Sequence, residues 1–226
     1  MFFYDWTFII IIPALILAAW AQMRVSSTFN KYSKISSING YTGAQVARML
    51  LDAEGLFEIS VEMTEGRLTD HYDPKKRVMR LSREVYSGNS VASIGVAAHE
   101  TGHAIQHQKR YTPLQIRSSI VPVVNFSSNI SWGLFILGFM FGSSYLINIG
   151  IVLFIAVVFF QMVTLPVEFD ASNRALRILE HKNILYSDEL KGARAVLSAA
   201  AMTYVAAAIT AVLQLVRLIL LSRDRE

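Results

Sequence analysis

His99-Glu100-Thr101-Gly102-His103 is the stretch around which the rest of the chain is arranged, and it carries the pattern H-E-x-x-H. In an α-helix, side chains at positions i and i+4 lie on one face, about 6 Å apart along the axis. Two imidazoles at this spacing can bind one zinc ion, with Zn–N bonds of about 2.1 Å. The glutamate between them can take a proton from a water molecule that the metal activates. The stretch therefore predicts a zinc hydrolase, and the competing interpretation is a polar helix with two unrelated histidines.

The composition indicates a membrane protein. Hydrophobic residues make up 53% of the 226 residues and charged residues 17%, whereas typical domains have about 45–50% and about 25%. The excess is gathered in three or four long apolar runs, each suited to crossing a bilayer. We therefore expect an integral membrane protein, mainly α-helical, in which a polar α+β domain is joined to about four transmembrane helices.

The chain contains no cysteine, which limits the kinds of metal site and nucleophile that it can form. Without thiols the chain has no disulfides, no thiolate metal ligands and no cysteine nucleophile. A zinc site must then be built from histidine, carboxylate and water.

The net charge of +4 is modest, and acidic residues lie between the basic ones. This pattern argues against nucleic-acid binding and fits a surface that faces anionic lipid.

The first transmembrane helix is expected within residues 1–22. A removable signal peptide is the competing interpretation, because Ala19-Trp20-Ala21 resembles a cleavage site. No lysine or arginine precedes the apolar run, so an uncleaved helix is favoured. Arg24, Lys31 and Lys34 follow the run, which predicts that the N-terminus lies outside and the next domain in the cytoplasm.

Residues 23–117 are predicted to form the polar domain. Thr42 is suited to cap a helix from Gly43 to about Glu54. Turn signals then separate three short strands, which we expect to form a small antiparallel sheet. A helix from Ser90 to about Gln108, capped by Ser87 or Asn89, carries the H-E-x-x-H stretch. The expected strands are Leu56–Met63, Arg67–Tyr72 and Arg77–Ser82.

Two apolar runs within residues 118–165 predict a transmembrane hairpin. Pro166 suits the first turn of a new helix from Val167 to about Glu180, in a connecting segment of residues 166–192. Residues 193–226 are predicted to form a C-terminal transmembrane helix. A fourth crossing would place Arg223 and Arg225 outside, against the usual distribution of positive charge, so its topology is left open.

A catalytic zinc site needs a third protein ligand besides the two histidines. Glu168 is favoured, because a hairpin returns it to the side and depth of the histidine helix. Asp170 is its rival for the same reason. His107 is less suitable, because about 12 Å of helix rise separates it from His99. We interpret His107 as a residue near the site rather than a ligand.

Four segments resemble the YugP family of neutral zinc membrane peptidases. They are residues 68–74, 98–107, 122–126 and 164–169, and the resemblance extends from about Phe29 to Ala207. It implies a zincin-like catalytic domain with one zinc ion per chain, bound by His99, His103 and Glu168. It also implies a peptidase of the bacterial cell membrane, whose catalytic domain faces the cytoplasm.

A more remote similarity connects the chain with the CAAX-processing and heat-shock membrane metallopeptidases. In that group an aspartate four residues after the ligand glutamate orients a ligand histidine. Ser172 occupies that position here. Asp170 and Asn173 are the candidates to replace the aspartate.

The predicted reaction is hydrolysis of a peptide bond, with Glu100 as the general base. His71 and Tyr72 are candidate donors to the developing oxyanion, as are His181, Arg174 and Arg177, and the competing interpretation of each is an ordinary surface residue. If the strand Arg77–Ser82 lies at a sheet edge, it could bind an extended peptide. The expected partners are a peptide or membrane-protein substrate and the lipid bilayer, while protein partners are not readable from the sequence.

Two other functions remain open at this stage. One is a non-catalytic scaffold or assembly factor in which zinc only ties the polar domain to the hairpin, although such a site needs no base like Glu100. The other is a zinc hydrolase that acts on a lipid or a small amide. Mn²⁺ or Co²⁺ could also occupy the same ligands.

Overall fold

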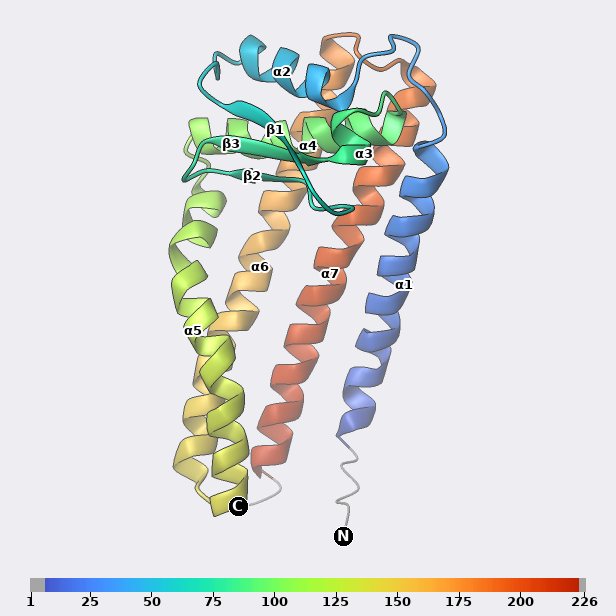
Figure 1. The fold of residues 1–226 in the computed structure, drawn as a ribbon. Helices are drawn as coiled ribbons and strands as arrows, with labels where there is room; N and C mark the ends of the chain where they lie inside the picture. Colours follow the sequence, from blue (N-terminus) through green and yellow to red (C-terminus); the bar gives the residue numbers. More distant parts are fainter. Residues whose placement is uncertain (1–6, 224–226) are drawn as a thin grey trace.

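Four long helices form a bundle with a small polar domain at one end (Figure 1). The computed structural model describes residues 7–223, so part of the predicted first helix and Arg225 lie outside the described residues. Each of the four is long and apolar enough to cross a membrane, which agrees with the predicted number. They are α1 (Phe8–Tyr32), α5 (Thr112–Phe141), α6 (Ser144–His181) and α7 (Ser187–Arg223).

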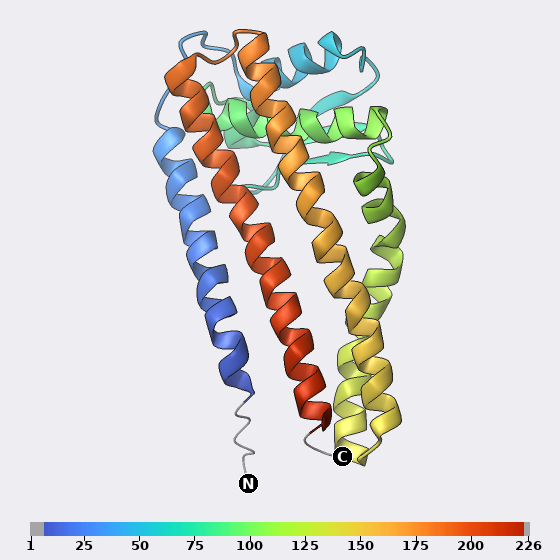
Figure 2. The same ribbon diagram turned by 180° about the vertical axis from the view of Figure 1, so that it is seen from behind.

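The helices alternate in direction, so that α7 ends near the level at which α1 begins (Figures 1 and 2). At that end Arg217 Nε donates a hydrogen bond to Thr7 Oγ1 over 3.2 Å. The C-terminal helix, whose topology the sequence left open, therefore makes a fourth pass along the bundle. Arg223 lies at the end remote from the polar domain.

The predicted helix break at Pro166 is wrong, because α6 runs through it without interruption. Proline removes one backbone donor, but long membrane helices tolerate this when neighbouring helices support them. Here α5 and α7 both pack against α6. The loop between α5 and α6 is short: Gly142 takes the left-handed conformation with φ +63°, and the Ser143 side chain accepts a hydrogen bond from Leu146 N.

The sheet is mixed rather than antiparallel as predicted. Its strands are β1 (Ser60–Thr64), β2 (His71–Asp73) and β3 (Val78–Ser82), in the order β1-β3-β2. β3 pairs in parallel with β1 and antiparallel with β2. β3 is therefore central, and the proposed peptide-binding edge at Arg77–Ser82 is wrong. Both edges of β3 are occupied by neighbouring strands, and its side chains are largely buried on both faces as well.

The remaining helices of the polar domain are α2 (Gly43–Ala53), α3 (Arg83–Tyr86) and α4 (Val91–Gln108). Thr42 and Gln45 form a capping box at the start of α2, as the sequence favours. The cap of α4 is Ser90, whose side chain accepts from Ser93 N, and not Ser87 or Asn89. α4 runs across the long helices beside the sheet (Figure 1) and is buried along most of its length. This position sets the H-E-x-x-H stretch against α6 and α7.

Candidate metal centre

The centre depends on a close crossing of α4 and α6. Gly102 lies where the two helices meet, and a Cβ atom built there would be 2.6 Å from the carbonyl oxygen of Ala171. A side chain at this position would push the helices apart, so glycine is required for the approach. The crossing places the histidines of α4 beside one turn of α6.

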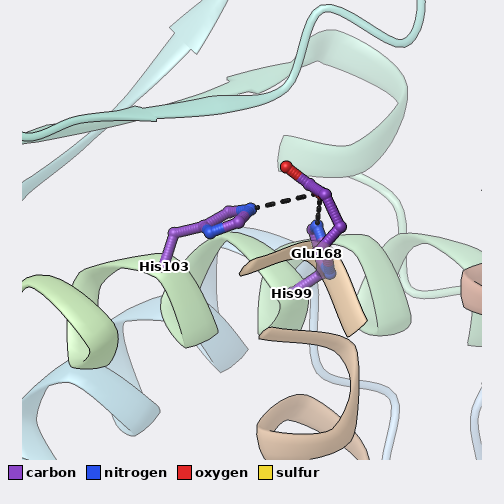
Figure 3. A group of neighbouring side chains, drawn as sticks. All are labelled: His99, His103 and Glu168. Atoms are coloured by element: carbon purple, nitrogen blue, oxygen red, sulfur yellow. Dashed lines mark ion pairs between the residues drawn. The ribbon is translucent and has the colours of Figure 1, made fainter. Parts of the chain in front are cut away.

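His99, His103 and Glu168 converge at this crossing (Figure 3). Glu168 Oε2 lies 3.3 Å from His99 Nε2 and 3.6 Å from His103 Nε2. The three candidate ligand atoms all lie within 4.8 Å of one another. Two nitrogens and one carboxylate oxygen form a donor set that suits zinc, with the fourth position left for water or substrate.

The hydrogen bonds around the cluster leave these ligand atoms turned toward one point. His99 Nδ1 lies 3.1 Å from Ser172 Oγ, and His103 Nδ1 lies 3.0 Å from Gln106 Oε1. Each imidazole is thus held through the nitrogen that does not face Glu168, as is usual for metal-binding histidines. Glu168 Oε2 is buried and has no hydrogen-bond partner within residues 7–223. A buried carboxylate is stabilised by a cation, and this oxygen lies beside two imidazole nitrogens, so the residues fit a zinc ion.

Gln106 connects the centre to a second group of side chains. Its Nε2 donates hydrogen bonds to Val167 O and to Asp170 Oδ2, each over 2.8 Å. Asp170 in turn accepts from Arg174 Nε over 2.6 Å. Because Gln106 is fully buried, this arrangement fixes the amide oxygen toward His103. Asp170, the rival ligand in the sequence, lies in this network and not in the cluster.

The other carboxylate oxygen of Glu168 contacts a positively charged side chain. Arg117, near the start of α5, donates from Nη1 to Glu168 Oε1 over 2.9 Å. Burial alone would lower the pKa of His103, but the carboxylates of Glu168 and Glu100 outweigh it and raise that pKa above its usual value. The two carboxylates therefore favour a positive charge at the imidazole of His103.

Glu100 lies next to the cluster and lines a cavity of about 250 Å³ together with His99, Asp70 and Tyr204. Its side chain is largely buried. Burial raises the pKa of Asp70, and two hydrogen bonds from Ser82 oppose the rise while the charge of Glu100 adds to it. Tyr204 reaches this cavity from α7. One candidate metal ligand, His99, thus lines a cavity together with the carboxylate of Glu100 and the phenol of Tyr204.

Several residues singled out in the sequence lie away from this point. His71 is exposed, with Nδ1 2.8 Å from the carbonyl oxygen of Thr69. Tyr72 Oη lies 2.9 Å from His107 Nδ1, and both line a second cavity of about 790 Å³. Asn173 is exposed on α6. The position that the family pattern left in doubt is filled by Ser172 itself, which contacts His99.

Gln106, Arg117 and Tyr204 are the site residues that the sequence analysis did not single out. Gln106 carried a usable signal, since residues three apart on a helix are neighbours and it follows His103 by that spacing. Arg117 and Tyr204 carried none, because they come from helices whose packing against α4 and α6 is set by the tertiary fold.

Taken together, fold and centre define a helical membrane protein with a buried His-His-Glu cluster beside a glutamate. Comparison with known proteins gives the family. Residues 7–223 match the family described as "Putative neutral zinc metallopeptidase", and the chain belongs to this family. It is 51% identical over 210 residues to "Putative membrane protease YugP" of Bacillus subtilis (strain 168), covering 93% of each chain. No solved structure matches the chain significantly.

Proposed function

We propose that this protein is a zinc-dependent membrane endopeptidase that hydrolyses peptide bonds at the membrane surface. The observation that carries the proposal is the convergence of His99, His103 and Glu168 on one point, with Glu100 beside it. A purely structural zinc site is closed and needs no adjacent base. The names of the family and of the Bacillus subtilis relative support the same class of reaction.

His99, His103 and Glu168 would hold the zinc ion, which would supply Lewis-acid activation of water and of the peptide carbonyl. Glu100 takes the proton from the attacking water and then gives it to the leaving amine. Tyr204 donates a hydrogen bond to the carbonyl oxygen as that oxygen gains negative charge. Ser172 and Gln106 keep the imidazole rings in place throughout.

The free edge of the sheet offers a place for the substrate backbone. Within the described residues, β2 pairs only with β3, so its other edge is open to an extended peptide. The residues around β2 line both cavities: Asp70 the 250 Å³ cavity, Tyr72 the 790 Å³ cavity. The metal-centre helix α4 contributes to both as well. A peptide beside β2 would therefore pass the catalytic group with side chains directed into each cavity.

The depth of the centre suits substrates that emerge from a membrane. Glu168 lies about 36 Å along α6 from Ser144, whereas the hydrocarbon core of a bilayer is about 30 Å thick. With the α5–α6 loop at one membrane face, the centre lies close to the other face. Basic residues near the polar domain, including Arg24 and Lys31 on α1, favour the cytoplasmic face of a bacterial cell membrane.

Replacing Glu100 with Gln tests the proposal. The full-length variant, in lipid nanodiscs, should bind zinc as the native chain does and lose cleavage of a peptide library by at least about 100-fold. Glu180→Gln on the exposed side of α6 serves as the matched control and should keep both properties. Unchanged cleavage in Glu100→Gln would remove Glu100 from the mechanism. Zinc binding by the native chain without any cleavage would favour the scaffold.

A further inference from the structure

The 250 Å³ cavity continues beyond the catalytic residues between α1, α4 and α7. Apart from His99 and Glu100, its walls are mainly aliphatic and aromatic, and they belong largely to two membrane helices. An apolar cavity of about 150 Å³ binds a molecule as large as benzene. The cavity therefore has room for the side chain of leucine, methionine or phenylalanine. Its principal apolar residues are Val25, Phe29, Val96, Val196, Leu197 and Ala200.

From this we infer that the cavity binds a large apolar side chain of the substrate, next to the bond that is cleaved. The inference rests on the proposed function and adds a substrate class to it. The inference is based on the position of the cavity next to the candidate centre. His99, a candidate metal ligand, and Glu100, the candidate base, both line the cavity. A side chain that enters this cavity belongs to a residue at or beside the reacting carbonyl.

The charge of the cavity argues against an acidic substrate side chain. Among residues 7–223, the charged members of its lining are Asp70 and Glu100, both acidic, and neither lysine nor arginine lines it. Acidic substrate side chains would be repelled. Asp70 is already engaged, because Oδ1 accepts from Ser82 N over 2.7 Å and both carboxylate oxygens accept from Ser82 Oγ. A basic side chain would compete with those bonds, whereas an apolar one gains by leaving water.

Leu68 lies at the edge of the cavity in an unusual backbone conformation. Its φ is +57°, in the left-handed region that non-glycine residues rarely adopt. Its side chain lines the cavity and is 38% exposed. Strained residues of this kind gather at ligand-binding sites. Here the strain directs a leucine toward the cavity, where it extends the apolar surface toward solvent.

The test uses amino acid hydroxamates, which bind zinc without needing turnover. In the zinc-loaded full-length chain, leucine hydroxamate should bind about 10- to 100-fold more tightly than glycine hydroxamate, because its side chain is buried. Lysine hydroxamate should show no such gain. Ala200→Phe and Val25→Phe fill the cavity from α7 and from α1, and each should abolish the preference for leucine. Ser198→Phe places the same ring on an exposed position of α7 and should keep it.

The outcomes separate this inference from the proposed function. Equal affinity of the native chain for leucine and glycine hydroxamates would overturn the inference. So would a preference that survives in both filled variants, or tighter binding of lysine hydroxamate. Zinc content measured on each variant shows that the metal centre is intact. Peptide cleavage by the same native sample decides the endopeptidase proposal independently.

Discussion

Glu168 uses its two carboxylate oxygens differently. Oε1 accepts a hydrogen bond from Arg117, while Oε2 faces the two imidazoles. The arginine therefore fixes which oxygen is presented to a metal ion and limits rotation of the carboxylate. The interactions around His99 and His103 have the same character, since each ring is held through the nitrogen that faces away from the cluster.

The first prediction concerns Glu168 itself. Glu168→Ala should reduce zinc content from about one ion per chain to a small fraction, because two histidines alone bind zinc weakly. Metal analysis of the purified full-length chain is the measurement. Glu180→Ala, on the exposed side of the same helix, should retain zinc. Equal zinc content in Glu168→Ala and the native chain would require another third ligand.

Gln106 is expected to act through His103. Gln106→Ala should weaken zinc binding about 10- to 100-fold, because the imidazole loses the group that orients it. A competition titration with a zinc chelator measures the affinity. Gln108→Ala, on the exposed end of α4, is the control. If the two variants bind zinc equally well, the contact with Gln106 has no positioning role.

Tyr204 is expected to act in the transition state. Tyr204→Phe should lower kcat about 100-fold while zinc content and KM change little, as for loss of a single oxyanion donor. Tyr72→Phe should leave kcat nearly unchanged, because its hydroxyl contacts His107 instead of the centre. The opposite pattern would restore Tyr72, one of the candidate donors that the sequence suggested.

At the scale of elements, the crossing of α4 and α6 controls whether the centre exists. Gly102→Ala should separate the helices and lower both zinc affinity and thermal stability, since the added methyl group meets the backbone of Ala171. Gly95→Ala is the matched control, because a Cβ there would meet Ala193 at 3.4 Å, an ordinary contact. Thermal unfolding of both variants, with and without zinc, distinguishes the two positions.

Elements with strong local signals were predictable from the sequence. The apolar runs marked four long helices, and Thr42 and Gly55 marked the ends of α2. The sheet was harder to predict, because strand order depends on contacts between distant residues. β1 pairs with β3, although β2 lies between these two strands in the sequence. The helix break predicted at Pro166 was wrong for a related reason. Packing of α5 and α7 against α6 outweighs the local free-energy cost of proline.

For the candidate centre, sequence reasoning succeeded where helix spacing or chain topology carried the information. The i, i+4 rule placed His99 and His103 together, and the return of the hairpin brought Glu168 to them. Arg117 and Tyr204 depend on how whole helices are rotated against one another, which no local pattern encodes. For Ser172, the sequence predicted which position should orient a ligand histidine but not that a serine there would do so. Whether its hydroxyl reaches His99 depends on the distance between the two helices.

At the scale of the whole molecule, the orientation in the membrane can be tested directly because the chain contains no cysteine. Ser144→Cys lies at the α5–α6 loop and Lys76→Cys between β2 and β3, and both positions are exposed. In intact cells an impermeant maleimide should label the first variant and not the second. Labelling of both after permeabilisation is the control. Reversed labelling would place the polar domain outside.

The uninterrupted α6 joins the membrane loop at Ser144 to the candidate ligand Glu168 in one rigid rod. A helix that meets a thinner or thicker bilayer tilts or shifts to match it, and here any such adjustment is carried to the metal centre. The distance between Glu168 and the histidines of α4 would then respond to lipid chain length. If the proposed hydrolysis occurs, we expect it to be fastest at one acyl-chain length and slower on either side, so that its rate reports the thickness of the membrane.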